Sequence, residues 1–434
     1  MPIKEFAARR RQLMRMMGEH SIAILPAAPV RQRNRDVEYP YRPDSDFYYL
    51  TGFPEPEALA VLSPGREHGE FVLFCRERDP DKETWHGRRA GLEGARERYG
   101  ADDAFPITDA DDILPGMIEH AEKVFYTMGC HPDYDERLMQ YLRKIRANAR
   151  SGARVPAEFV SLEHFLHDMR LFKSPEEVRL MRRAGEIATE AHVRAMRACR
   201  PGLTEYQMEA ELLHVFRRHG ATPAYPSIVG GGANGCILHY TENSDALRDG
   251  DLLLIDAGAE HQCYASDITR TFPVNGRYSG EQRALYEVVL AAQAAAIAAV
   301  RPGQHWQAPH EAAVQVLAEG LSALKILKGS ADFIIESGAY KRFYMHRTGH
   351  WLGMDVHDVG DYKVGDAWRQ LEPGMTLTVE PGLYIAAGAE GVEERWWDIG
   401  IRIEDDVLVS EDGCEVLTAA CPKQIADIEA LMRG

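Results

Sequence analysis

Acidic residues stand at the ends of apolar, strand-like segments in the second half of the sequence. Asp256 follows the apolar residues 252–255. Glu380 follows the β-branched residues 376–379 and directly precedes a Pro-Gly turn signal. An uncompensated carboxylate is costly to bury, so acids in these positions need partners. Asp267 lies in a second strand-like segment, and a hairpin between the two aspartate segments would bring both carboxylates side by side, although either acid alone is commonly a hydrogen-bonded residue at a sheet edge.

A fourth acid, Glu404, ends the segment 399–404, in which isoleucines alternate with other residues. The strand period of two places the isoleucines on one face, and Arg402 with Glu404 on the other. Four carboxylates within a few ångströms repel one another by roughly 4 kcal/mol per close pair at an effective dielectric constant of about 20. They cannot all stay ionised without cations. If the four acids do converge, two divalent ions would bring the cluster close to neutrality.

Three histidines, His346, His350 and His357, fall close together beside Gly349 and Gly353. A lone histidine is usually structural, and the four-residue spacing of His346 and His350 would also fit one face of a helix. Glycines let the backbone approach closely, which favours the lining of a site.

The clearest internal boundary lies near Ser174, which is followed by Pro175 and, three residues on, by Glu177. Serine at the N-cap, proline at the first helical position and glutamate at the third predict a long helix that begins there. Similar signals predict helices after Thr204 and Ser279. The second half therefore indicates an α+β domain. The first half indicates a separate mixed α/β domain, with strands expected at residues 22–25 and 71–74 and helices at residues 92–99 and 138–147.

Charge and cysteine content exclude some partners and compartments. With 67 acidic and 50 basic residues, the chain has a formal charge of -17, which disfavours nucleic acid and anionic membrane surfaces as partners. Seven scattered cysteines fit reduced thiols and a cytoplasmic protein. Arg9, Arg10 and Arg11 before the apolar residues 21–30 imitate an export signal, but Pro26 and Pro29 interrupt the run, so a basic helix that leads into a buried strand is the preferred interpretation.

The order and spacing of Asp256, Asp267, His350, Glu380 and Glu404 resemble the metal-binding pattern of the pita-bread metallopeptidases, which include methionine aminopeptidase, prolidase and aminopeptidase P. Segments of the first half resemble the extra domain of bacterial aminopeptidase P: residues 34–36, 41–42, 45–47, 50–53 and 85–89. The resemblance implies a C-terminal pita-bread domain at 173–434 and a smaller mixed α/β N-terminal domain at 1–172.

The resemblance also implies a role for each candidate residue. Asp256 would chelate one metal ion, Asp267 and Glu404 would bridge two ions, and His350 and Glu380 would complete the second. An oxygen-rich ligand set favours manganese, while zinc, cobalt and iron stay open. Further roles follow for catalytic residues His239, His346, His357, Glu380 and Arg402, and for the substrate-binding residues Tyr384 and Trp85. Arg347 departs from the pattern, because a small residue is expected after His346.

The implied function is an Xaa-Pro aminopeptidase, which releases the N-terminal residue from peptides with proline in the second position. Two alternatives share the fold: a prolidase restricted to dipeptides, and a metal-free peptide-binding module. A homo-oligomer, either a dimer or a tetramer, is also expected from the resemblance.

Overall fold

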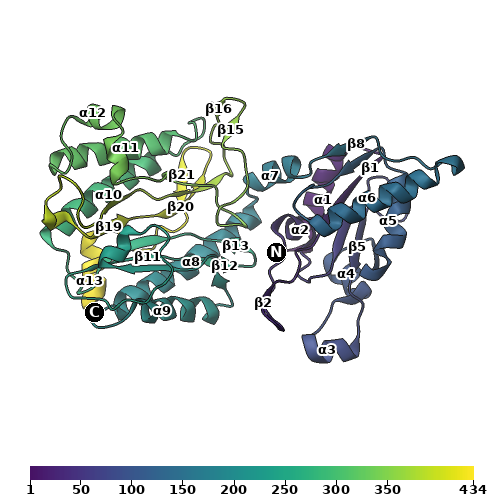
Figure 1. Ribbon diagram of the computed structural model, residues 1–434, viewed down its shortest axis with the longest axis horizontal. Coiled ribbons are helices and arrows are strands. Elements are labelled where there is room, and N and C mark those ends of the chain that lie inside the picture. Colours follow the sequence, from purple (N-terminus) through teal and green to yellow (C-terminus); the bar gives the residue numbers. More distant parts are fainter. The chain divides into compact units, whose positions relative to one another are not determined.

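The computed structural model describes residues 1–434 as two compact units, Met1–Met169 and Arg170–Gly434. Figure 1 shows both units, each containing helices and strands. Each unit has its own hydrophobic core. The helix α7 (Glu163–Leu171) spans the point at which the chain passes from unit 1 to unit 2.

Unit 1 is built around one mixed six-stranded sheet. Its strands are β1 (Ser21–Pro26), β4 (Leu59–Leu62), β5 (Phe71–Cys75), β6 (Asp103–Pro106), β7 (Lys123–Phe125) and β8 (Glu158–Val160). Their order in the sheet is β6-β5-β4-β1-β7-β8. The strand β4 runs antiparallel to β1 and β5, and the other neighbours are parallel. A separate hairpin pairs β2 (Gln32–Asn34) with β3 (Val37–Glu38).

The helices of unit 1 are α1 (Ile3–Met17), α2 (Ser45–Thr51), α3 (Pro80–His86), α4 (Gly91–Tyr99), α5 (Ala110–Glu119) and α6 (Pro132–Ala147). The strands predicted at 22–25 and 71–74 are confirmed as β1 and β5, and both are fully buried. The helices predicted at 92–99 and 138–147 are confirmed as α4 and α6, and α6 begins earlier, with Pro132 in its first turn.

The basic N-terminal segment forms α1, and the apolar run after it forms the buried strand β1. Arg9 and Arg10 are buried rather than solvated. Arg9 donates to the carbonyl of Tyr49 at 3.1 Å, and Arg10 donates to the carbonyl of Leu50 at 2.8 Å. The Arg10 guanidinium also lies 4.0 Å from the centre of the Phe71 ring. These contacts tie α1 to the end of α2, so the arginines that imitate an export signal have a structural role.

The strands of unit 2 form several small antiparallel sheets. They are β9 (Thr222–Pro223), β10 (Ile228–Gly231), β11 (Leu252–Asp256), β12 (Ala259–His261), β13 (Tyr264–Ala265), β14 (Thr269–Pro273), β15 (Lys363–Val364), β16 (Ala367–Trp368), β17 (Thr376–Val379), β18 (Gly382–Ile385), β19 (Ile399–Arg402), β20 (Asp405–Val409) and β21 (Cys414–Val416). The sheet orders that matter for the site are β10-β11-β14, β17-β20-β21 and β18-β19.

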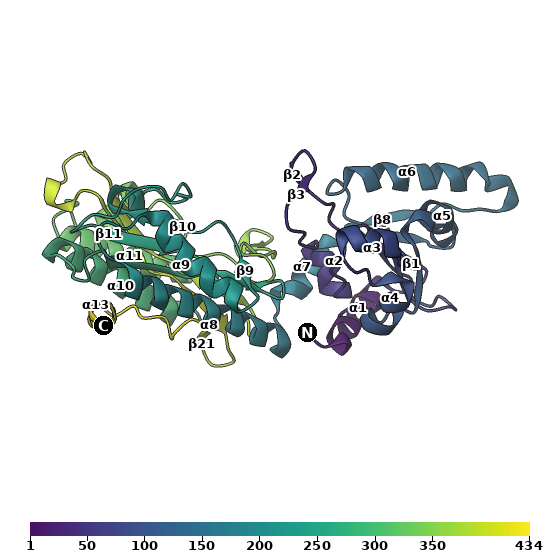
Figure 2. The same ribbon diagram turned by 90° about the horizontal axis from the view of Figure 1, so that it is seen from below.

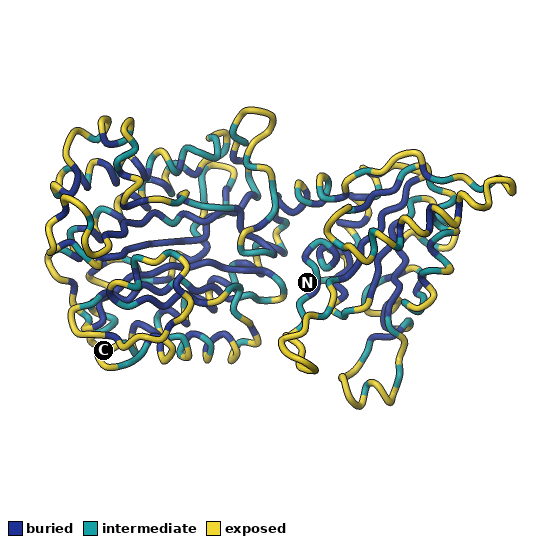
Figure 3. Tube along the Cα trace, viewed as in Figure 1, coloured by how far each residue is buried: buried dark blue, intermediate teal, exposed yellow.

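The helices of unit 2 are α8 (Pro175–Ala198), α9 (Glu205–Arg218), α10 (Gly280–Ala299), α11 (Ala308–Ala323), α12 (Ala331–Glu336) and α13 (Ile425–Arg433). All three predicted helix starts are confirmed: Ser174 and Ser279 form capping boxes, and the Thr204 N–H donates to the Gln207 side chain at 2.9 Å. In Figure 1 the strands lie between the pair α10 and α11 and the pair α8 and α9. Figure 2 shows that the members of each pair run beside each other. In Figure 3 the buried stretches follow the strands.

The predicted hairpin between the aspartate segments is present. Antiparallel pairing of β11 with β14 sets Asp256 opposite Thr269. The second segment is not one continuous strand, because the chain leaves β13 at Ala265 and enters β14 at Thr269. Asp267 lies in this break, where its backbone N–H donates to the Asp406 carboxylate at 3.1 Å instead of to a strand neighbour. The break turns Asp267 out of the ladder.

A buried ion network fastens β14 to β20 and to the end of the chain. Arg270 and Asp405 are both fully buried and form an ion pair at 2.7 Å. Lys423 adds a second cation, 2.6 Å from Asp405. Arg270 also donates to the carbonyls of Cys421 and Pro422, at 3.0 Å each. Because a buried pair needs several such partners to offset desolvation, the C-terminal segment is part of the support for these strands.

None of the helices combines the length and the apolar composition that would be needed to cross a membrane.

Candidate metal centre

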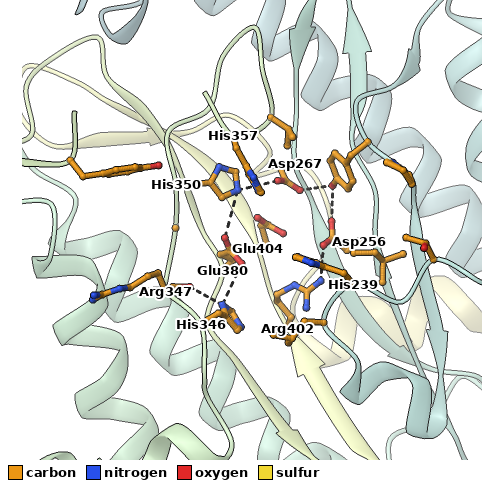
Figure 4. A pocket seen from close by; sticks show the side chains of 18 of the residues that line it. His239, Asp256, Asp267, His346, Arg347, His350, His357, Glu380, Arg402 and Glu404 are labelled. Atoms are coloured by element: carbon orange, nitrogen blue, oxygen red, sulfur yellow. Dashed lines mark hydrogen bonds and ion pairs between the residues drawn. The ribbon is translucent and has the colours of Figure 1, made fainter. Parts of the chain in front are cut away.

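The five candidate metal ligands line one cavity of about 710 Å³ in unit 2. They come from strand ends and from connecting loops, and Figure 4 shows their side chains converging on a common space. The ligands are Asp256 at the end of β11, Asp267 before β14, His350 in a loop, Glu380 after β17, and Glu404 between β19 and β20. Strand ends place carboxylates at a fixed edge, which explains why segments so far apart in the sequence meet.

Three of these residues form the tightest group. Asp267, His350 and Glu404 each present one ligand atom within 4.8 Å of the other two. Asp267 is only 5% exposed and Glu404 only 2%. The Nε2 atom of His350 lies 3.4 Å from Asp267 Oδ2. Its Nδ1 atom lies 2.9 Å from the carbonyl oxygen of Trp351, which directs Nε2 toward the carboxylates, as in metal-binding histidines.

Glu380 and Asp256 flank this group. Glu380 Oε1 lies 3.7 Å from His350 Nε2. Asp256 is joined to Asp267 through the Tyr225 hydroxyl, which donates to Asp256 Oδ1 at 2.6 Å and also contacts the Asp267 carboxylate. The other oxygen of Asp256 accepts from Arg402 at 2.6 Å. All five predicted ligands therefore face the same cavity.

Burial and mutual repulsion raise the pKa values of Asp267, Glu380 and Glu404. Burial, reinforced by Asp256, raises the pKa of Asp267. Burial, with Asp267 and Asp256 adding repulsion, raises the pKa of Glu380 to about 7. Burial beside Asp267 and Glu380 raises the pKa of Glu404 well above its usual value. Burial would lower the pKa of His350, but the adjoining carboxylates of Asp267 and Glu380 raise it to about 9. The side chains of the protein alone do not neutralise the negative charge of the carboxylate cluster.

A cluster of four carboxylates and one imidazole fits divalent cations of the harder kind. Carboxylate oxygen is the ligand that such ions prefer, and imidazole is common in the sites of first-row transition metals. No thiol lies on the cavity wall, which argues against a metal selected by soft ligands. The raised pKa values mean that the metal-free cluster disfavours the charged form of these carboxylates, a cost that bound cations would offset. The residues present therefore fit a metal centre.

The loop that carries His350 runs as an extra strand beside β17. The Thr378 N–H donates to the His350 carbonyl at 3.0 Å, and the Glu380 N–H donates to the Thr348 carbonyl at 2.8 Å. Gly349 is required for this contact, because a Cβ at that position would lie 2.0 Å from the Thr378 carbonyl oxygen. The segment from His346 to His350 is not helical, so the alternative of a shared helix face is excluded.

The remaining histidines also line the cavity. His239 follows a 3₁₀ turn at Gly232–Cys236, and the His357 ring centre lies 4.3 Å from that of His350. His346 Nδ1 lies 3.6 Å from Glu380 Oε2. Burial, with Arg402 nearby, lowers the pKa of His346 to about 3, so its ring is neutral. Partial burial and the neighbouring His350 lower the pKa of His357.

Arg402 and Tyr384 support the ligands from behind. Tyr384 is buried, and its hydroxyl lies 2.8 Å from His346 Nε2 and 3.0 Å from Arg402 NH1. It lies behind His346 and is not part of the cavity wall. Arg402 donates to Asp256 and, through Nε, to Thr269 at 3.1 Å. Trp85 belongs to unit 1, in α3, and is 84% exposed.

Sequence reasoning missed two hydroxyl groups that hold the carboxylates. Tyr225 joins Asp256 and Asp267, and the Thr269 hydroxyl donates to Glu404 Oε2 at 2.5 Å. Tyr225 lies in a short irregular segment with no periodic pattern, so nothing in the sequence marked it. Thr269 could have been found from strand pairing, because it lies opposite Asp256 in the ladder.

Comparison with protein families places this site in a known context. Residues 179–411 match the family described as metallopeptidase family M24. Residues 6–126 match the family described as aminopeptidase P, N-terminal domain. The first match covers more than half of the chain. The chain belongs to metallopeptidase family M24. The expected α+β fold, with a C-terminal pita-bread domain and an N-terminal aminopeptidase P domain, is thereby confirmed.

Relatives in this family match the chain along its whole length. The chain is 48% identical to the Xaa-Pro aminopeptidase of Escherichia coli over 99% of this chain and 97% of that protein. It is 45% identical to the Xaa-Pro aminopeptidase of Haemophilus influenzae over 100% and 98%. Among solved structures, aminopeptidase PepP of Pseudomonas aeruginosa matches with a TM-score of 0.99 and 61% identity, covering 100% of this chain and 98% of that one. Family membership and the cluster of Asp267, His350 and Glu404 identify a peptidase that uses divalent metal.

Proposed function

We propose that this metalloaminopeptidase is an Xaa-Pro aminopeptidase, which removes the first residue of peptides whose second residue is proline. The observation that carries the proposal is the convergence of all five ligand types in one cavity of a chain that matches Xaa-Pro aminopeptidases over nearly its full length. The prolidase alternative is not favoured, because the named relatives are aminopeptidases.

Each ligand has a proposed role in a centre with two metal ions. Asp256 would hold one ion, Asp267 and Glu404 would be shared by both, and His350 with Glu380 would hold the second. The support is geometric for Asp267, His350 and Glu404, whose ligand atoms lie within 4.8 Å of one another. The support for two ions is electrostatic, because one divalent cation together with Arg402, which pairs with Asp256, still leaves the four carboxylates with net negative charge, and a second cation removes it.

Bound metal ions supply an activated water and stabilise charge that develops on the scissile carbonyl. The side chains of the chain have separate tasks. Glu380, which lines the cavity beside His350, carries the proton to the leaving nitrogen. His239 and His357 stand on the open wall of the cavity, where they contact the substrate carbonyl. Arg402 holds Asp256 in place at 2.6 Å.

The preference for proline follows from the shape of the cavity rather than from hydrogen bonding to the amide. The nitrogen of an Xaa-Pro bond has no N–H, so a site that needs this donor rejects proline. Trp306, Tyr362 and Trp368 give the cavity an aromatic wall that suits the pyrrolidine ring. Tyr384 acts on substrate through His346, which its hydroxyl contacts at 2.8 Å.

Cleavage of three matched peptides tests the proposal. We expect the manganese-reconstituted protein to cleave an Xaa-Pro-Yaa tripeptide rapidly, the Xaa-Pro dipeptide more slowly, and an Xaa-Ala-Yaa tripeptide least. Cleavage of the dipeptide alone would instead assign a prolidase. A protein that holds no more than trace metal after reconstitution and cleaves none of the three would be a binding module.

Manganese is the proposed metal, because the ligand set is rich in oxygen. Elemental analysis after purification without added metal tests this, and zinc, cobalt or iron in its place would overturn it. We also propose a cytoplasmic protein, supported by seven free cysteines. The proposed working domains are residues 1–172 and 173–434, and the proposed assembly is a homodimer or homotetramer. Light scattering on the eluted protein tests the assembly, and a single-chain mass would contradict it.

A further inference from the structure

A second cavity of about 620 Å³ adjoins the metal-lined cavity in unit 2. The two cavities have His346 and Arg347 in common. His346 faces Glu380 at 3.6 Å and is engaged with Tyr384. Arg347, in contrast, points away from the carboxylates in Figure 4. Arg347, at the position where a small residue was expected, therefore lies between the metal-lined cavity and the second cavity.

The charge of Arg347 has no carboxylate partner. Its guanidinium donates to the neutral side chain of Gln307 at 3.0 Å and lies 5.8 Å from the ring centre of Trp368. Lys341, on the wall of the second cavity, likewise forms no ion pair. One carboxylate, Glu311, lies on this wall, and His305 stands 3.8 Å from it. The second cavity therefore carries excess positive charge, whereas the metal-lined cavity carries four acids.

His310 also lies on the wall of the second cavity. The Nδ1 atom of His310 lies 2.8 Å from the Thr348 hydroxyl. Burial, then Arg347 and Lys341, lowers the pKa of His310 to about 4. The ring is therefore neutral at physiological pH and does not add to the positive charge, but it can donate a hydrogen bond. A cavity with two unpaired cations and a neutral histidine is suited to an anion.

We propose that the second cavity binds a carboxylate on the leaving side of the peptide substrate, and that Arg347 selects for it. The proposal rests on the aminopeptidase function proposed above. The second cavity is within reach of a bound peptide, because His346 and Arg347 line both cavities. An extended peptide advances about 3.3 to 3.6 Å per residue, so the residues just after the scissile bond arrive at this wall. The carboxylate is either the C-terminus of a tripeptide or an acidic side chain of a longer peptide.

Two pairs of peptides distinguish these sources. The first pair is an Xaa-Pro-Leu tripeptide with a free C-terminus and the same tripeptide as an amide. The second pair is Xaa-Pro-Leu-Asp-amide and Xaa-Pro-Leu-Asn-amide. We expect kcat/KM to be about tenfold higher for the charged member of at least one pair, as for a charge-assisted hydrogen bond. Arg347→Gln is expected to remove that preference, so that kcat/KM becomes equal within each pair. Arg347→Lys is expected to restore part of it.

Arg342→Gln is the matched control, because Arg342 lies on the same segment, is exposed, and donates to the Glu390 carbonyl at 2.7 Å away from both cavities. The Arg342→Gln variant is expected to keep the preference for the charged peptide of the pair. Equal kcat/KM within both pairs for the unchanged protein, or a preference that survives Arg347→Gln, would overturn the proposal while leaving the aminopeptidase function in place.

Calorimetric binding of the dipeptide Pro-Leu and of Pro-Leu-amide to the manganese-reconstituted protein gives a readout without turnover. We expect about tenfold tighter binding of the free acid, and loss of this difference in Arg347→Gln. A protein that cleaves no proline peptide but shows this difference would overturn the proposed function and support the carboxylate site. Equal binding of the acid and the amide would count against the site.

Discussion

Glu404 illustrates the conflict between folding and metal binding at the scale of one residue. It is 2% exposed, and its carboxylate accepts from Thr269 while facing Asp267 and Glu380. Without a cation, burial and the neighbouring acids favour its protonated form. Glu404 thus destabilises the metal-free protein and serves as a ligand in the metal-loaded protein.

The substitution Glu404→Gln separates these two effects. We expect activity to fall by roughly 10³-fold or more, because a bridging ligand is lost. We also expect the metal-free variant to melt at a higher temperature than the metal-free parent, since the amide is neutral without the proton that Glu404 must take up on burial in this cluster. Activity assays and thermal melts in chelator measure both. His346→Ala is expected to be milder in activity.

Glu415→Gln is the matched control, because Glu415 forms a surface ion pair with Arg182 at 2.7 Å. It is expected to change neither property by much, since exposed pairs contribute about 0–1 kcal/mol. A Glu404→Gln protein with full activity would contradict the ligand assignment.

Metal removal is expected to make stability depend on pH in a defined direction. In the metal-free fold the pKa of Glu380 is raised from 4.5 to about 7, and that of His350 from 6.5 to about 9. Both groups bind protons more tightly in the folded state than in the unfolded chain, so the stability that they contribute is lost as pH rises from about 4.5 to about 9. Metal ions bind deprotonated ligands, so metal affinity increases with pH.

The difference in Tm between manganese-loaded and chelated protein is therefore expected to be larger at about pH 8 than at about pH 5.5. Thermal melts at both pH values measure it. A difference that shrinks toward high pH would show that the carboxylates are not the groups that metal relieves.

Gly349 connects local backbone geometry to the site at the scale of elements. A Cβ at this position would lie 2.0 Å from the Thr378 carbonyl oxygen in β17, the strand that leads into Glu380. We expect Gly349→Ala to separate the His350 loop from β17 and to destabilise the fold by about 1–3 kcal/mol. Metal affinity is expected to fall with it, because His350 and Glu380 would move apart. Denaturant unfolding and metal titration measure the two effects.

Gly413→Ala serves as the control, because a Cβ at Gly413 meets nothing within 4 Å and its φ is not positive. It is expected to be nearly neutral. Unchanged metal affinity in Gly349→Ala would mean that the loop tolerates displacement from β17.

Elements with strong local signals were predictable from the sequence, and contacts between distant segments were less so. The capping-box sequences at Ser174, Thr204 and Ser279 are local patterns, and each marks a helix start in the structure. The break at Asp267 depends on the Asp406 carboxylate, which no spacing in the sequence reveals. Tyr225 is held by the aspartates themselves, so its place became evident only once the strands were paired.

The separate cores of the two units govern how the whole molecule responds to metal. All five candidate ligands lie in unit 2. A ligand that binds only the folded state stabilises the part that holds it, by about 4 kcal/mol at 1,000 times its Kd. We therefore expect calorimetry to show two transitions, of which a chelator lowers one and leaves the other unchanged. Parallel shifts of both transitions would show that the units unfold together.

The ion network of Arg270 affects when the metal site can form during synthesis of the protein. The ligands run from Asp256 to Glu404, and Arg270 between them is fastened to carbonyls at Cys421 and Pro422. Translation delivers the chain from its N-terminus, so the scaffold is incomplete until Cys421 and Pro422 have left the ribosome. The metal ions then bind to the folded domain and not to the nascent chain. The geometry of the folded site therefore determines which metal is bound.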